Sequence, residues 1–432
     1  MSKKKINPDH VRRRNRPSAN DEVIEKQFKE LLSRSVFSQE SYYRSLGMRS
    51  RILNLPLMVA AILTLIWRQV PSVHELTRML NREELLWCKP VKVRQQSLSE
   101  RFLVFPASLF ERVYKDLVPR LICRWNEREA RPLPPAVEHA QGHFDEILVA
   151  DGSTLEALFR KLDSLKDVEV GKLAGKMCLV IDLVRQLPKE LWFSEEAMTH
   201  DSSFTQKLLD LVSGKTLLIL DRGFYDFTFF ARLVDQGTQL ITRLKANAAI
   251  ETVRILTTTD TVRDSLIRLG TGQNGAPILT MRLIEVRVER TWHRYVTSVL
   301  DPHVLPPFVV ADLYRRRWRI EDAFNTAKRL LGLSYLWTGS VNGIQLQIWA
   351  TWLFYAILVD LGDAVADAMA LPFDRISLEM LFRGIYHFTQ DRLKGKASDP
   401  IAYFADPLNK DLGIVKQKRK QVPKLDLSPY PT

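Results

Sequence analysis

The sequence predicts an α/β protein that begins with an all-helical domain. Apolar residues recur at helical spacing through residues 21–135, apolar strands then alternate with helices, and a strand-rich block precedes a basic helix. With 432 residues and 46% hydrophobic content, the chain can bury the cores of two or three domains. The expected parts are a disordered basic tail (1–20), a helical N-terminal domain (21–135), an α/β domain (140–350) with a strand-rich insertion at about 246–300, and a helical C-terminal region with a basic tail (351–432).

The N-terminal part of the chain has two interpretations. Between Asp21 and about Asn126, short helical patterns are separated by basic residues, which is typical of a DNA-binding helical domain. Ser97–Tyr114 could hold a helix-turn-helix, but it carries no diagnostic turn. A helical cap on the following domain explains the same pattern equally well.

The charge and the cysteine content narrow the class of protein. The 63 basic residues exceed the 50 acidic residues by 13, which suits a polyanionic partner, although proteins that bind no nucleic acid also reach this charge. The three cysteines lie far apart and show neither a disulfide framework nor metal-binding spacing, which indicates a reducing cytoplasm.

Two apolar segments are candidates for membrane insertion. Leu55–Trp67 has about 13 residues and is too short to span a bilayer. Ile344–Val359 is interrupted by Gln345 and Gln347, so we expect it to be a buried core helix. The N-terminus is charged and no apolar stretch follows at a signal-peptide distance. We therefore expect a soluble cytoplasmic protein with no membrane partner.

The middle of the chain alternates strands and helices after the proline-rich joint Arg131–Pro135. Apolar runs predict strands, and apolar residues at helical spacing predict the helices between them. Ala246–Leu300 is rich in strands, because apolar and charged residues alternate there. The expected strands are Phe144–Ala150, Lys176–Val184, Glu190–Phe193, Thr216–Leu220 and Gln239–Leu244, with helices at Phe204–Val212 and Phe227–Asp235.

Two aspartates follow apolar strands directly. Asp151 comes after Ile-Leu-Val-Ala, and Asp221 comes after Leu-Leu-Ile-Leu. Catalytic side chains gather at strand ends along one edge of an α/β sheet. The nearby Gly152 and Gly223 leave room for a backbone or a ligand to approach. A plain turn aspartate explains each one alone, but the pair together with a later glutamate indicates a carboxylate cluster.

That glutamate lies in a basic helix predicted over Asp312–Trp337. Tyr314, Arg317, Glu321 and Lys328 are spaced by 3, 4 and 7 residues, so at about 100° per residue they fall on one narrow stripe. An adjacent apolar stripe can seat the helix on a core. A solvated helix with intrahelical ion pairs is the competing interpretation. The apolar stripe consists of Leu313, Ile320, Phe324, Ala327 and Leu331.

Three carboxylates from separate elements suit a pair of magnesium ions. Asp151, Asp221 and Glu321 offer the oxygen ligands that hard divalent cations prefer. Two such ions can activate a water or a 3′-hydroxyl and stabilise the leaving oxygen of a phosphodiester. The histidines show no zinc-hydrolase pattern, and no phosphate-binding glycine loop is present, so we expect no nucleotide cofactor.

The order of these motifs resembles the insertion-sequence-four family of DDE transposases. The resemblance rests on Asp-Gly-Ser, Asp-Arg-Gly-Phe and the four spaced residues of the basic helix, and it covers roughly Phe144–Ala350. It implies a ribonuclease-H-like mixed sheet with flanking helices and a strand-rich insertion before the glutamate. It also implies that Asp151, Asp221 and Glu321 bind two Mg²⁺ ions, with Mn²⁺ as a substitute. Tyr314, Arg317, Trp318 and Lys328 would then contact DNA.

The resemblance further implies a cut-and-paste DNA transposase that binds terminal inverted repeats, cleaves them through a hairpin and joins the 3′ ends to target DNA. Trp292 and Tyr295 are the candidates for stacking on a flipped base, although a core role is the alternative for both. We expect a homodimer on paired ends, with its interface after Ile344, in a nucleoid-associated cytoplasmic protein. The alternatives are a ribonuclease-H-like nuclease without strand transfer and a catalytically inactive DNA-binding regulator.

Overall fold

The computed structural model describes residues 17–49, 51–155, 175–271, 275–334, 336–417 and 424–432. Most of the basic tail expected at 1–20, and residues 418–423 of the C-terminal tail, lie outside these ranges. The described chain forms two compact units. The first contains the described residues of 17–132 and 324–417, and the second contains the described residues of 133–155, 175–323 and 424–432.

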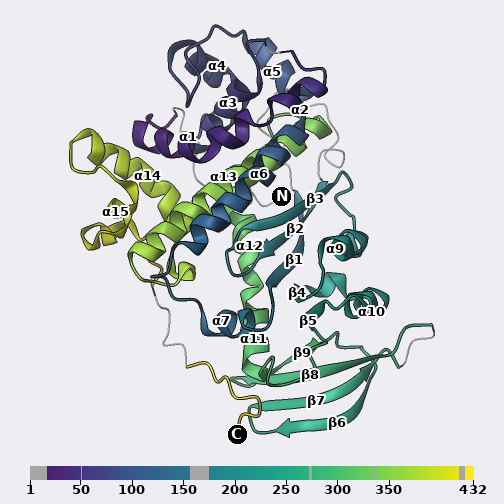
Figure 1. Ribbon diagram of the computed structural model, residues 1–432. Coiled ribbons are helices and arrows are strands. Elements are labelled where there is room, and N and C mark those ends of the chain that lie inside the picture. The colour runs from purple at the N-terminus through teal and green to yellow at the C-terminus, as the bar shows by residue number, and fades with distance from the viewer. Residues whose placement is uncertain (1–16, 50, 156–174, 272–274, 335, 418–423) are drawn as a thin grey trace, which may run out of the picture. The chain divides into compact units, whose positions relative to one another are not determined.

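The second unit is built on a mixed sheet of nine described strands in the order β3-β2-β1-β4-β5-β9-β8-β7-β6 (Figure 1). β1 pairs in parallel with β4, and β4 pairs in parallel with β5, whereas the other neighbours are antiparallel. The predicted α/β class is therefore confirmed. The strands are β1 (Glu146–Leu155), β2 (Gly175–Asp182), β3 (Pro188–Ser194), β4 (Thr216–Leu220), β5 (Gln239–Arg243), β6 (Ile250–Thr258), β7 (Val262–Leu269), β8 (Leu279–Val288) and β9 (Thr291–Thr297).

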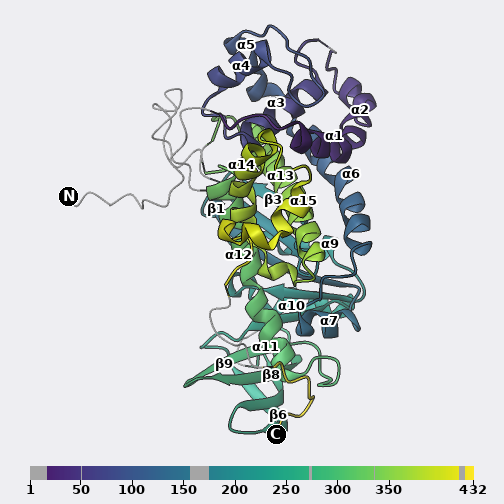
Figure 2. The same cartoon turned by 90° about the vertical axis from the view of Figure 1, so that its left-hand side faces the viewer.

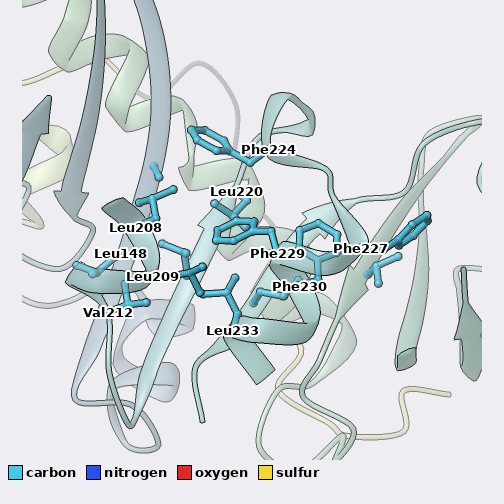
Figure 3. Close-up of a cluster of buried hydrophobic side chains, with 14 of the residues drawn as sticks. Leu148, Leu208, Leu209, Val212, Leu220, Phe224, Phe227, Phe229, Phe230 and Leu233 are labelled. Carbon is cyan, nitrogen blue, oxygen red and sulfur yellow. The ribbon is translucent and has the colours of Figure 1, made fainter. Parts of the chain in front are cut away.

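Helices cover the central strands because those strands are apolar on both faces. All five residues of β4 are buried, and Leu218 and Leu220 point into a cluster with residues of α9 and α10. Figure 3 shows this cluster, in which Leu208 and Phe230 meet the strand side chains. α7 packs on β1, and α11 packs on β5 and β8. These elements are α7 (Pro135–Gln141), η3 (Asp201–Phe204), α9 (Thr205–Leu211), η4 (Arg222–Phe224), α10 (Phe227–Asp235) and α11 (Pro307–Arg316), followed by α12 (Trp318–Asn325).

The block expected at about 246–300 contains the antiparallel strands β6 to β9. A fully buried ion pair joins β7 to β8. The Arg282 guanidinium donates to both carboxylate oxygens of Asp264, and it also donates to the carbonyl of Leu305 at 2.7 Å. Because each of these two buried charges has a partner, the ion pair leaves neither charge unpaired inside the block.

The first unit is helical throughout its described secondary elements. α13 lies along α6 (Figure 1), and Figure 2 shows α14 and α15 beside α13. Arg128 and Arg131 near the end of α6 pair with Asp363 of α13. The elements are α1 (Glu22–Phe37), α2 (Glu40–Ser45), α3 (Leu55–Trp67), α4 (Val73–Arg82), α5 (Gln95–Val104), α6 (Ala107–Asn126), η5 (Thr326–Leu330), α13 (Val341–Ala368), η6 (Phe373–Arg375), α14 (Leu378–Leu393), α15 (Pro400–Ala405) and η7 (Pro407–Leu412).

The burial of α13 confirms one expectation. Among the described residues, α13 alone is long and apolar enough to cross a membrane, but 94% of its most apolar window is buried in the protein. It is therefore a core helix, as Gln345 and Gln347 predict. α3, α5, α6, α14 and α15 pack on this helix, and the homodimer interface expected after Ile344 stays a prediction.

Candidate active site

Two aspartates lie where two parallel strands part. The last residues paired in parallel are Ala150 on β1 and Leu220 on β4. Asp151 and Asp221 directly follow these two residues in the sequence. Neighbouring strands are about 5 Å apart, so both carboxylates arise at the same edge of the sheet. The predicted convergence of the two aspartates is present in the structure.

The sequence predicts that the first strand ends at Asp151, and this prediction is wrong. β1 continues to Leu155 because it pairs with β2 beyond the end of β4, with Asp151 opposite Leu179. Asp151 is consequently held inside a ladder and is 8% exposed. Asp221 instead leaves the sheet and caps η4, where its carboxylate accepts from the Gly223 N–H at 3.4 Å.

The third carboxylate lies on the predicted basic helix, which is interrupted at a single residue. α11 ends at Arg316 and α12 begins at Trp318, while Arg317 between them keeps helical dihedral angles (φ −51°, ψ −31°). Glu321 lies one turn after this break, on α12. The apolar stripe is confirmed, since its members are all buried, for example Leu313 and Ile320 at 0% exposure.

Arg317 lies among all three carboxylates. Its Nη1 is 2.5 Å from Oδ2 of Asp151, and its Nη2 is 3.4 Å from Oδ1 of Asp221 and 3.3 Å from Oε1 of Glu321. The arginine side chain is 8% exposed, whereas the side chains of Asp221 and Glu321 are 34% and 38% exposed. One planar guanidinium therefore gathers three carboxylates from β1, η4 and α12.

The electrostatics of the site follow from burial and from this clustering. The pKa of Asp151 is raised to about 7, chiefly by burial and also by the nearby charges of Asp221 and Glu321, against the lowering effect of Arg317. Burial lowers the pKa of Arg317, but Asp151 and Asp221 outweigh it, so that pKa is raised overall. The arginine stays charged, and Asp151 is the carboxyl group that resists ionisation.

The donor set fits a hard divalent cation. The three groups supply oxygen ligands only, as Mg²⁺ prefers, and each already contacts one positive charge. Within the described residues, no three acidic, histidine or cysteine side chains converge closely enough to hold an ion by themselves. The guanidinium of Arg317 stands where part of the cationic charge would lie, so an ion would have to displace it.

The remaining residues of the basic helix are placed differently from one another. Trp318 is 59% exposed, with its ring 5.5 Å from the Arg317 guanidinium carbon, whereas Tyr314 is buried at 6% exposure. Lys328 lies on the π-helical turn η5, in the first unit. A π-helical turn holds more residues than an α-helical one, so the expected place of Lys328 on the four-residue stripe stays a prediction.

The two aromatic residues of β9 that are candidates for base stacking differ in their exposure. Tyr295 is 7% exposed and packs on Tyr314, with ring centroids 5.3 Å apart. Trp292 is half-buried, and the Arg263 guanidinium carbon lies 4.5 Å from its ring centroid. Trp292 is therefore the more accessible ring of the two.

Sequence reasoning overlooks a fourth carboxylate beside the site. Asp201 of η3 pairs with Lys176 of β2 at 2.6 Å, and its charge contributes to the raised pKa of Asp151. Its own segment carries no motif. The available signal was indirect, because Gly152 and Gly223 both leave space that something must fill.

The sequence of this chain is similar to a known protein family and to several named proteins. Residues 142–357, half of the chain, match the model of the transposase DDE domain family. A Sinorhizobium fredii protein named as a transposase is 26% identical over 221 residues, which are 47% of this chain and 60% of that protein. Insertion-sequence transposases named in Geobacillus stearothermophilus and Synechocystis are each 24% identical, over 38% and 37% of this chain and 44% and 45% of their own lengths. The chain thus spans 60% or less of each of these relatives.

Proposed function

Because the chain belongs to the transposase DDE domain family, we propose that it is a cut-and-paste DNA transposase whose catalytic carboxylates are Asp151, Asp221 and Glu321. The observation that carries this proposal is the gathering of these three groups around Arg317 from three separate elements. The order β3-β2-β1-β4-β5, with β1, β4 and β5 parallel, supports a ribonuclease-H-like core. The insertion β6 to β9 then accounts for the long separation between Asp221 and Glu321.

In this proposal the carboxylates hold two Mg²⁺ ions, with Mn²⁺ as a substitute. When bound, the ions supply activation of a water or 3′-hydroxyl and stabilisation of the leaving oxygen. Asp151 must give up its proton for this role, because its pKa of about 7 leaves it partly protonated at neutral pH. Arg317 must turn away from the carboxylates, and its guanidinium then becomes free to contact a DNA phosphate.

The basic helix supplies the proposed DNA contacts near the site, with Arg317 contributing once its guanidinium has left the carboxylates. Arg317, Trp318 and Lys328 are proposed to contact the transposon end. Tyr314 is buried, so its proposed role is to support Arg317, whose guanidinium carbon lies 5.8 Å from its ring centroid. Trp292 is the preferred candidate for stacking on a flipped base during hairpin formation, ahead of Tyr295.

The N-terminal helices are proposed to bind DNA through a basic pocket. The pocket lies over the start of α5, where helix N–H groups favour an anion. None of the described residues that line it is acidic, and its five cations suit a phosphodiester backbone. Those cations are Arg49, Arg51, Lys92, Arg94 and Arg101.

A cleavage assay tests the catalytic proposal. Asp151→Ala, Asp221→Ala and Glu321→Ala should each abolish cleavage of element ends in Mg²⁺ while end binding is retained. Asp235→Ala, at an exposed aspartate of α10, is the matched control and should cleave like wild type. Wild-type cleavage by any of the first three variants would remove that residue from the site.

The same assay separates the alternatives. A nuclease without strand transfer would cut the ends but join none to target DNA, and an inactive regulator would bind without cutting. The element's terminal inverted repeats are the substrate for this comparison. Denaturing gels should show covalently closed ends if the hairpin route is used. Joining two ends at once also requires two active sites, so we propose that the protein acts as a homodimer on paired ends. We further propose that it is a cytoplasmic protein associated with the nucleoid.

A further inference from the structure

One acidic side chain near the site has no part in the function proposed above. Asp201 opens η3, the short turn between β3 and α9. Phe204 at the end of the same turn is 3% exposed and belongs to the core cluster, so this segment is anchored to the body of the unit. The position of the Asp201 carboxylate is therefore set by the fold and not by a free loop.

The Asp201 carboxylate fills the space that two glycines leave open. A Cβ added at Gly152 would lie 1.9 Å from Oδ1 of Asp201, and a Cβ added at Gly223 would lie 2.2 Å from Oδ2. Any residue larger than glycine at either position would thus collide with the carboxylate. Gly152 directly follows Asp151, and Gly223 lies two residues after Asp221, so one side chain touches the backbone beside both aspartates.

Lys176 fixes the carboxylate from a third strand. Its Nζ is 2.6 Å from Oδ1 of Asp201, and both side chains are mostly buried, at 13% and 16% exposure. Lys176 lies on β2 opposite Thr154 of β1, next to the strand that carries Asp151. Because the pair is mostly buried, water screens the attraction between Lys176 and Asp201 less than it screens a surface ion pair. The lysine therefore holds the Asp201 carboxylate more strongly.

We propose that Asp201 is a positioning residue, which, held by Lys176, keeps the backbone of Asp151 and of Asp221 at a set spacing through Gly152 and Gly223. The meaning of that spacing for catalysis rests on the proposed function. Asp201 touches no reacting atom in this role. A small displacement of either aspartate would misplace the groups that must act together on one phosphodiester.

A double-mutant cycle measured by urea unfolding tests whether the Asp201 carboxylate fills the space beside the two glycines. This experiment requires no cleavage activity. Gly223→Ala should lower the urea midpoint of the wild-type protein, because the new methyl group meets Oδ2 of Asp201. In an Asp201→Ala background the same substitution should lower the midpoint by less than half as much. An equal shift in both backgrounds would overturn the proposal, since the carboxylate would then not be what fills the space.

Steady-state cleavage kinetics test whether Asp201 positions Asp151 and Asp221 for catalysis. Asp201→Asn keeps the shape of the side chain but loses the ion pair, and it should lower kcat by about tenfold or more with KM for the DNA unchanged. Lys176→Met should do the same, and the double variant should be little worse than either. Asp210→Asn, at an exposed aspartate of α9, is the matched control.

The outcomes distinguish failure of this inference from failure of the proposed function. If wild type cleaves and folded Asp201→Asn and Lys176→Met match the control, Asp201 has no positioning role. If both variants lose only stability, with kcat of the folded fraction unchanged, the role is structural and the inference is overturned. If wild type itself does not cleave, the proposed function fails, while the unfolding cycle still decides whether Asp201 holds the two glycines.

Discussion

Replacing Arg317 by glutamine should destabilise the protein without divalent ions and tighten its binding of Mg²⁺. In the metal-free protein the guanidinium contacts all three carboxylates, and its side chain is 8% exposed. Breaking such a buried pair costs about 3–5 kcal/mol. We expect the low end of this range, because Asp151 can take up a proton and its pKa is already raised to about 7.

Arg317→Gln should strengthen the binding of Mg²⁺, although it lowers the stability of the metal-free protein. In the wild type the ion must displace Arg317, whose charge then remains nearby. At roughly 8 Å in water, a single positive charge repels a divalent ion by about 1 kcal/mol, or about fivefold in affinity. Glutamine removes this repulsion and the competition for the carboxylates, so fivefold is a lower bound for the gain.

Urea unfolding with and without Mg²⁺ measures both effects. Ligand binding to the folded state raises its stability in proportion to the logarithm of concentration over Kd, so the midpoint shift reports affinity. Arg317→Lys keeps the charge and should behave like wild type in Mg²⁺ binding. The reasoning is refuted if Arg317→Gln gains no more stability from Mg²⁺ than Arg317→Lys does.

Three further predictions concern the protonation of Asp151, the buried pair of Asp264 and Arg282, and the basic pocket. Burial raises the pKa of Asp151 from its ordinary 3.8 to about 7 in the folded state. Without divalent ions, stability should therefore fall by up to roughly 4 kcal/mol as pH rises between these values, and Asp151→Asn should flatten that part of the urea-midpoint profile. Asp264→Ala should cost about 3–5 kcal/mol of unfolding free energy, because it strands the fully buried charge of Arg282; a loss below about 1 kcal/mol would contradict this account. Arg94→Glu in the basic pocket should weaken duplex binding at low salt and reduce the slope of log affinity against log salt by about one, whereas Lys26→Glu on α1 should leave that slope unchanged.

The amino-acid sequence by itself determined the local elements and the identity of the acidic residues. The predicted strand Thr216–Leu220 and helix Phe227–Asp235 match the structure at both ends, because apolar periodicity and flanking turn residues are local signals. The strand-rich block was also visible as alternation of apolar and charged residues. The family was evident from the spacing of three short motifs.

Only the tertiary structure decided how these pieces act together. The strand carrying Asp151 continues past it because β2, and not β4, is its partner there, and pairing between strands is not written in either strand alone. Arg317 contacts Glu321 at the i+4 spacing that the helical stripe predicts, but its contacts with Asp151 and Asp221 join segments far apart in the sequence, and only the tertiary fold brings them together. Asp201 lies 50 residues from Asp151 in a segment without a motif, and long-range packing alone brings its carboxylate against Gly152 and Gly223.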